Sequence, residues 1–385
     1  MMTASLLLSE DQQMLAEAAR NFCQKHTPIS QLRALRDRRD ETGFERETWQ
    51  RMVALGWTGM TVPEAYGGYA FGYGGLGVVL QETGRTLTSS PLIASILIGA
   101  TALDKLAGEG IKQELLPRLV AGELLLALAL DERPLHQPER IATTAVRDGE
   151  DYTLNGEKAF VLDGHVADKL LVVARTSGAE TDQDGISVFL VAAGTPGLTV
   201  TRTWMVDSRN AARVTLKDVR VPVTALLGAE GSAHAALQEA LDIARIGVAA
   251  EMLGSVEETF TRTVDYLNQR QQFGVLIGSF QGLQHRAAIM YSEIELCRSA
   301  VRAALAALDA DDGDTGEIAA LASLAKAKLS EVFQLVSNEG IQMHGGIGMT
   351  DEFDIGFFIK RARVAEQFLG DAAFHRDRFA TRNGF

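Results

Sequence analysis

The chain has 385 residues, a formal net charge of -13 at pH 7 and a pI near 5.1. This acidic balance leaves no basic surface for a phosphate backbone, which argues against nucleic acid as a partner. The length predicts two or three packed subdomains rather than one core. The N-terminus lacks a basic segment followed by an apolar one, and no uninterrupted apolar run reaches about eighteen residues. We therefore expect neither export nor a membrane span.

The two cysteines, Cys23 and Cys297, lie far apart in the sequence. This arrangement supports neither a disulfide framework nor a metal site. We expect two buried thiols in a protein of the reducing cytoplasm, with no bound metal.

Helical periodicity dominates the first part of the chain. Apolar residues recur at helical spacing over residues 9–121, and Ser9 is a suitable N-cap for the first helix. A glycine-rich segment at residues 63–77 interrupts the pattern and predicts a shaped loop that runs into a helix over residues 76–84. Residues 1–124 are predicted to be a helical domain.

A β domain is predicted at residues 125–232, followed by a helical domain at residues 233–385. Six short runs rich in β-branched residues predict strands at 142–146, 151–154, 169–174, 186–192, 198–202 and 213–219. The dipeptide Asn155-Gly156 predicts a hairpin turn. The acidic loop 309–315 predicts a solvated turn. The fold class is thus α+β and multidomain.

Five sequence signatures resemble those of the acyl-CoA dehydrogenase flavoproteins and cover essentially the whole chain. They are Pro63-Glu64-x-Tyr66-Gly67-Gly68 with Glu82-x-Gly84-Arg85 and Ser90-Pro91, Asn155-Gly156-Glu157-Lys158, Val219-x-Val221-Pro222 with Leu227-Gly228-x-Glu230-Gly231, Arg270-x-x-Phe273-Gly274 with Phe280-Gln281, and Gln342-Met343-His344-Gly345-Gly346. The resemblance implies FAD as cofactor, a C-terminal four-helix bundle, an acyl-CoA substrate and an electron-transfer flavoprotein as acceptor.

The resemblance assigns six residues to the adenine-dinucleotide half of FAD: Arg270, Phe273, Gln281, Gln342, Gly345 and Gly346. Arg270 offers a guanidinium suited to a pyrophosphate, and the two glycines allow close approach of backbone N–H groups. In the family these two sets come from neighbouring subunits. This implies a homodimer, a homotetramer or a heteromer, with an interface built from the C-terminal helices.

The sequence departs from the family at the catalytic base. The carboxylate that removes the α-proton normally occupies the position of Leu369, or, in a minority of relatives, the position of Ala244. Neither side chain can accept a proton. Glu366 and Asp371 are weak candidates for a relocated base, because both need the loop to re-form.

Arg245, which follows Ala244, could orient an acyl group or pair with Asp242. The loop that covers the flavin in the family falls on residues 131–138. Its two hydroxyl contacts are replaced by Asp131 and Gln137, and a third is replaced by Leu162. Each lost bond to a buried polar edge costs about 1–3 kcal/mol. A carboxylate at position 131 would also disfavour a reduced, anionic flavin.

These departures predict an FAD-dependent acyl-CoA dehydrogenase subunit that lacks its own base and works with a catalytic partner. The chain resembles the small subunit of heteromeric members such as pimeloyl-CoA dehydrogenase. Two alternatives remain: a single-chain enzyme with a relocated base, and a non-catalytic scaffold of the same fold. The acyl chain is not predicted. His136, His285 and His344 are assigned no chemical role, and Trp49, Trp57 and Trp204 are expected in the core or at a wall of the site.

Overall fold

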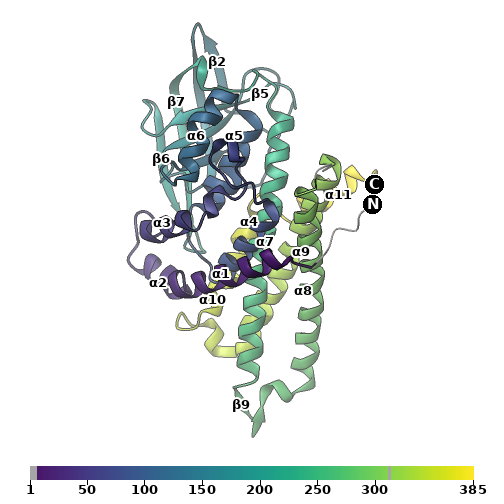
Figure 1. Ribbon diagram of the computed structural model, residues 1–385. Helices are drawn as coiled ribbons and strands as arrows, with labels where there is room; N and C mark the ends of the chain where they lie inside the picture. Colours follow the sequence, from purple (N-terminus) through teal and green to yellow (C-terminus); the bar gives the residue numbers. More distant parts are fainter. Residues whose placement is uncertain (1–6, 311–313) are drawn as a thin grey trace. The chain divides into compact units, whose positions relative to one another are not determined.

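The computed structural model describes residues 7–310 and 314–385, and the chain forms two compact units (Figure 1). The predicted α+β class is confirmed, with N-terminal helices, a middle β domain and C-terminal helices. Within the described residues, no helix is both long enough and apolar enough to cross a bilayer.

The first unit comprises the N-terminal segment up to Arg38, Gly72–Ser89 and Arg245–Phe385. Its elements are α1 (Glu10–His26), α2 (Ile29–Asp37), α4 (Tyr73–Arg85), most of α7 (His234–Leu267), β9 (Gln271–Gln272), β10 (Val275–Leu276), η5 (Ile277–Ser279), α8 (Gln281–Leu308), α9 (Thr315–His344), η6 (Gly345–Met349), α10 (Ile355–Gln367) and α11 (Ala372–Arg382). Helix α9 packs against α8, α10 and α11.

The second unit comprises Arg39–Phe71 and Ser90–Ala244. Its helical elements are α3 (Arg46–Ala54), η1 (Trp57–Gly59), η2 (Glu64–Tyr66), η3 (Leu92–Ala100), α5 (Thr101–Leu106), α6 (Glu109–Val120) and η4 (Val223–Ala225). Its strands are β1 (Leu126–Ala129), β2 (Thr144–Asp148), β3 (Asp151–Leu162), β4 (Lys169–Arg175), β5 (Ile186–Ala192), β6 (Leu198–Trp204), β7 (Asn210–Pro222) and β8 (Leu226–Leu227).

The eight strands form one sheet in the order β6-β7-β3-β2-β4-β5-β8, with β1 parallel to β4. Each predicted strand overlaps one of these. The predicted turn at Asn155-Gly156 is wrong, because β3 continues through it and pairs with β7 on both sides. The register shifts between Leu154 and Gly156, so the dipeptide forms a bulge. A Cβ at Gly156 would lie 2.7 Å from the Cα of Thr143, which explains the glycine.

Side chains cap the starts of α1 and α4 in the first unit. The Ser9 hydroxyl accepts a hydrogen bond from Gln12 N at 3.2 Å, while the Gln12 side chain accepts one from Ser9 N, which confirms the predicted N-cap. At α4, Asp309 accepts from the backbone N–H groups of Tyr73 and Gly74, at 2.6 and 2.7 Å. Asp309 lies in an exposed turn, as expected, but its carboxylate also caps α4; residues 311–313 of that loop lie outside the described residues.

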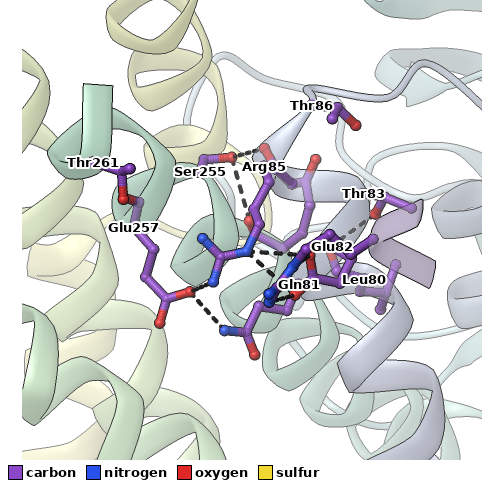
Figure 2. Close-up of polar contacts among 12 residues, drawn as sticks. Leu80, Gln81, Glu82, Thr83, Arg85, Thr86, Ser255, Glu257 and Thr261 are labelled. Carbon is purple, nitrogen blue, oxygen red and sulfur yellow. Dashed lines mark hydrogen bonds and ion pairs between the residues drawn. The ribbon is translucent and has the colours of Figure 1, made fainter. Parts of the chain in front are cut away.

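Helices α4 and α7 approach each other through their backbones. A Cβ at Gly84 would lie 2.0 Å from the carbonyl oxygen of Glu251, and one at Gly254 would lie 1.7 Å from that of Gln81. Only glycine permits this distance. The Ser255 hydroxyl donates to Gly84 O at 2.8 Å across the same crossing (Figure 2).

Two buried carboxylates connect four helices beside this crossing. Glu82 accepts from Arg20 of α1 at 2.9 Å, and Glu257 accepts from Arg298 of α8 at 2.7 Å. Figure 2 shows Arg85 of α4 between the two carboxylates, in contact with both. Because each buried charge is paired and hydrogen-bonded, the network fixes the register of these helices.

Candidate functional site

The first set of predicted cofactor residues lies at the hairpin formed by β9 and β10. Arg270 follows the end of α7, and among the described residues its guanidinium has no ion-pair partner. The Phe273 side chain is 93% exposed and makes an edge contact with Phe280, with ring centroids 6.2 Å apart. Gln281 begins α8 and is also exposed. A guanidinium, an aromatic face and an amide are thus all available to a ligand.

The second set lies at the end of α9, where Gln342, Gly345 and Gly346 are exposed. His344, the last residue of α9, is held by two contacts. Its ring stacks on Tyr266, with ring centroids 4.4 Å apart, and its Nδ1 donates to Gly340 O at 2.7 Å. Its burial lowers the pKa of this imidazole. His344 is therefore a packing residue in this chain.

The stacked pair also relates the two sets to each other. Tyr266 precedes Arg270 by one helical turn, and His344 directly precedes Gly345. The contact between Tyr266 and His344 thus joins the two segments that carry the predicted cofactor residues. The separation of the two sets in the sequence is therefore not, by itself, a reason to assign them to different cofactors.

Two exposed glycines support a bound cofactor at this place. Gly282 and Gly346 have no positive φ, and no heavy atom lies within 4 Å of the position that a Cβ would occupy at either residue. A ligand could therefore approach the backbone closely at both residues. Helix α8 also begins without a side-chain cap, and while Leu283 N and Gln284 N donate to Phe280 O, the N–H groups of Gln281 and Gly282 are available to an anion. These residues fit the adenine-dinucleotide half of FAD.

In the second unit, the loop at residues 131–138 contains an unexpected pair. Both carboxylate oxygens of Asp131 lie near Nδ1 of His136, at 2.9 and 3.0 Å, and the His136 side chain is 2% exposed. Nδ1 therefore carries a proton and donates it. The carboxylate of Asp131 is thus held by a hydrogen bond from a buried imidazole, and its effect on a reduced, anionic flavin stays a prediction.

The same loop is fixed at its start by a buried ion pair. Lys158 Nζ lies 2.7 Å from the Glu132 carboxylate and donates to Leu130 O at 3.1 Å. Burial lowers the pKa of Lys158, and Glu132 opposes that change. Ala159 N donates to Asp131 O at 2.7 Å. The loop is therefore preorganised even though the expected hydroxyls are absent.

Two aromatic residues of the second unit are exposed. Phe160 has a φ of 52° and is 45% exposed, and Trp204 is 56% exposed, with the Arg202 guanidinium 3.9 Å from its ring centroid. Trp49 and Trp57 are buried, as expected for core residues. Trp204 is not a core residue, because it ends an edge strand of the sheet.

Both positions at which a base was sought carry buried apolar side chains. Leu369 is 4% exposed with a φ of 58°, and Ala244 is fully buried within α7. The two nearby carboxylates have other contacts. Glu366 accepts from Gln334 Nε2 at 2.6 Å, and Asp371 caps α11 by accepting from Phe374 N at 2.8 Å. Each of these carboxylates is therefore already oriented by a contact within the chain.

Arg245 is fully buried, and its Nε donates to Leu369 O at 3.3 Å. Its guanidinium carbon also lies 5.5 Å from the Phe374 ring centroid. These contacts hold the loop between α10 and α11. A pairing with Asp242 or a contact with an acyl group stays a prediction.

Sequence reasoning missed two further side chains at that loop, Lys326 and His375, which are both fully buried. A signal was present for Lys326, because it shares the helical spacing of the buried residues Ala322, Leu329 and Phe333 on α9. No comparable signal marks His375. The cysteines are buried as expected, and burial raises the pKa of Cys23 to about 11 and that of Cys297 to about 12.

Comparison with known proteins covers nearly the whole chain. The acyl-CoA dehydrogenase N-terminal, middle and C-terminal domain models match residues 9–123, 136–219 and 234–383. Acryloyl-CoA reductase (NADH) of Anaerotignum propionicum is 32% identical over 377 residues, which is 96% of this chain and 93% of that protein.

Two solved structures are similarly close. The structure of the electron transferring flavoprotein of Acidaminococcus fermentans has a TM-score of 0.89 at 29% identity and covers 99% of both chains. The structure of the ChsE4-ChsE5 complex of Mycobacterium tuberculosis has a TM-score of 0.87 at 26% identity and covers 98% of both chains.

Proposed function

The chain belongs to the acyl-CoA dehydrogenase family, an FAD-dependent group of oxidoreductases acting on CH–CH groups, and from this premise we propose that it is a subunit without its own catalytic base. In this proposal it takes part in the α,β-dehydrogenation of a CoA thioester. The observation that carries the proposal is the pair of buried apolar residues, Leu369 and Ala244, at both positions where a base is expected.

When bound, FAD supplies the hydride acceptor for the β-carbon of the thioester. The contribution of this chain is binding and orientation. Arg270 is placed to neutralise the pyrophosphate, Phe273 to cover the adenine or ribose, and Gly345 and Gly346 to let the cofactor approach the backbone closely. Removal of the α-proton needs a carboxylate, and we assign that step to a partner chain.

The single-chain alternative has less support. It requires Glu366, which accepts from Gln334, or Asp371, which caps α11, to take over the role of a base placed at position 369 or 244. Loss of a positioned base costs about 10²–10⁴ in rate even in ordinary general-base catalysis, so a misplaced carboxylate would be a poor substitute.

Exposed apolar side chains on the long helices favour a partner. Ile289, Tyr291 and Leu296 of α8, and Leu324 and Leu335 of α9, are each at least 37% exposed. Helices α8 and α9 pack against each other (Figure 1). Exposed apolar side chains on neighbouring helices are consistent with a protein interface. The likeness to the ChsE4-ChsE5 complex supports a related chain as the occupant.

The acceptor is the remaining part of the proposal. We assign electrons leaving the flavin to an electron-transfer flavoprotein, as the family resemblance implies. The similarity to the Acidaminococcus fermentans structure supports this assignment.

The proposal is tested by expressing the chain alone and together with a related chain that carries the base. The lone protein, supplied with FAD and an artificial acceptor, should oxidise straight-chain acyl-CoA thioesters at a negligible rate, and the complex should turn over. Glu366→Gln should leave the activity of the complex nearly intact. Robust activity of the lone chain, abolished by Glu366→Gln or Asp371→Asn, would show that the base has moved within the loop.

A further inference from the structure

The connection between α10 and α11 has an unusual backbone. Leu369 and Gly370 both have positive φ, of 58° and 106°. A left-handed conformation is unfavourable for leucine and persists only where surrounding contacts determine it. Because this turn is not helical, its carbonyl oxygens do not accept hydrogen bonds from the backbone N–H groups of a helix and need donors from elsewhere in the chain.

Three fully buried side chains from three helices supply those donors. Lys326 of α9 donates from Nζ to Gly370 O at 2.8 Å and to Glu366 O at 3.0 Å. Arg245 of α7 donates to Leu369 O at 3.3 Å, and His375 Nε2 of α11 lies 3.0 Å from the same oxygen. A carbonyl oxygen can only accept, so this His375 nitrogen carries a proton.

All of these contacts are to main-chain oxygens, which every amino acid possesses. Packing closes the turn as well, since a Cβ at Gly370 would lie 2.4 Å from Cδ1 of Phe374. None of the contacts uses the side chain of residue 369. The backbone of the loop is therefore held whether that side chain is a leucine or a carboxylate.

We propose that Lys326 is a positioning residue, which fixes the backbone of residues 366–371 and so sets the direction of the side chain at position 369. Lys326 is central because it joins both ends of the turn, at Glu366 and Gly370. The proposal rests on the proposed function, in that position 369 matters for catalysis only in this family. It adds that the backbone contacts that would orient a base at position 369 are present in this chain, although the side chain there is a leucine.

Lys328 provides a matched control on the same helix. It lies two residues further along α9, on a different face, and pairs with Glu293 of α8. Lys328→Met removes a charge and an ion pair from α9 without reaching the loop. Any effect specific to Lys326→Met is then due to the loop contacts.

The experiment uses the full chain, loaded with FAD and carrying Leu369→Glu, with and without each lysine substitution. Leu369→Glu should give thioester-dependent flavin reduction. Adding Lys326→Met should lower kcat by about 100-fold with little change in KM, because a misplaced reacting group loses rate rather than binding. It should also raise amide hydrogen exchange in residues 368–375 by about tenfold. Adding Lys328→Met should change neither quantity.

The outcomes separate the two proposals. Unchanged kcat and unchanged exchange with Lys326→Met would overturn the positioning role. If Leu369→Glu gives no flavin reduction although FAD is shown to be bound, while Lys326→Met still raises exchange, position 369 is not a base position and the proposed function loses its main observation, whereas the positioning role stands. Should the methionine variant not fold, Lys326→Gln, which keeps an N–H donor, is judged by the same two measurements in comparison with Lys328→Gln.

Discussion

The carboxylate of Asp131 lies 2.9 Å from Nδ1 of His136, in the loop that takes the place of the family's flavin-covering segment. The sequence places a carboxylate where it would disfavour a reduced, anionic flavin. The structure shows that Nδ1 of the buried imidazole donates a hydrogen bond to this carboxylate, which orients it. The hydroxyl contacts expected in the family are replaced at Asp131, Gln137 and Leu162, so we expect the isolated chain to purify with little or no FAD.

His136→Gln should destabilise the fold by about 1–3 kcal/mol, because it removes a bond to a half-buried carboxylate. The free energy of unfolding is measured in urea, and His285→Gln, at an exposed position on α8, is the control. In the complex with a partner, His136→Gln should also weaken FAD binding. Unchanged stability would show that the pair contributes nothing measurable to the loop.

Arg270→Ala should weaken FAD binding to the complex by about tenfold or more, because a charge-assisted contact to a phosphate is lost. Stability should not change, since the guanidinium has no ion-pair partner among the described residues. Arg51→Ala, at an exposed i,i+4 pair with Glu47, is the matched control. An FAD affinity equal to that of the wild type would remove Arg270 from the site.

Lys326 predicts a specific dependence of stability on pH. Burial and the neighbouring Arg245 lower the pKa of this amine from 10.5 to about 7, while Glu366 and Asp371 oppose the change and Arg361 adds to it. Between these two values the unfolded chain binds more protons than the folded chain, so the free energy of unfolding rises with pH. The gain should be on the order of 1 kcal/mol per pH unit in this window.

Urea unfolding at about pH 7 and about pH 9 measures this gain, and the comparison with Lys326→Met isolates it from other titrating groups. Lys328→Met should keep the wild-type dependence. If the free energy of unfolding changed with pH to the same extent in the wild type and in Lys326→Met, a buried amine with a low pKa would be contradicted.

The sequence predicted the architecture well because its main signals are local. Each of the six runs predicted as strands overlaps an observed strand, and Ser9 caps the start of α1 as predicted. The exception at Asn155-Gly156 has a physical cause: pairing between β3 and β7 continues on both sides of the dipeptide, so the glycine serves a bulge against Thr143 instead of a turn.

The sequence predicted which positions to examine in the site but not their contacts, because the hydrogen-bond partners of a side chain depend on the tertiary fold. Sequence motifs located Leu369 and Ala244, but they could not show that Asp371 caps α11 or that Glu366 bonds to Gln334. Nor could they show that Lys326 donates to carbonyl oxygens about 40 residues away along the chain. Main-chain acceptors carry no sequence signal, so such contacts require the structure.

Substitution of glycines in the first unit should have one of two effects: loss of stability where backbones are in contact, or loss of FAD affinity where the glycine is open. At Gly84 an added Cβ would lie 2.0 Å from a backbone carbonyl of α7, and neither helix can shift without breaking the network around Glu82 and Glu257. Gly84→Ala should therefore destabilise the protein by about 3 kcal/mol or more. Gly254→Ala, on the other side of the crossing, should do the same. Both are measured by urea unfolding.

Gly346→Ala should show the reverse pattern. No heavy atom of the described chain lies within 4 Å of the added Cβ, so the free energy of unfolding should change by less than about 0.5 kcal/mol. A cofactor backbone that approaches this glycine closely would meet the new methyl group, so FAD affinity in the complex should fall by about tenfold. Gly110→Ala, an equally open glycine on α6, should change neither quantity. If Gly346→Ala binds FAD as tightly as the wild type, the open space beside Gly346 is not part of the cofactor site.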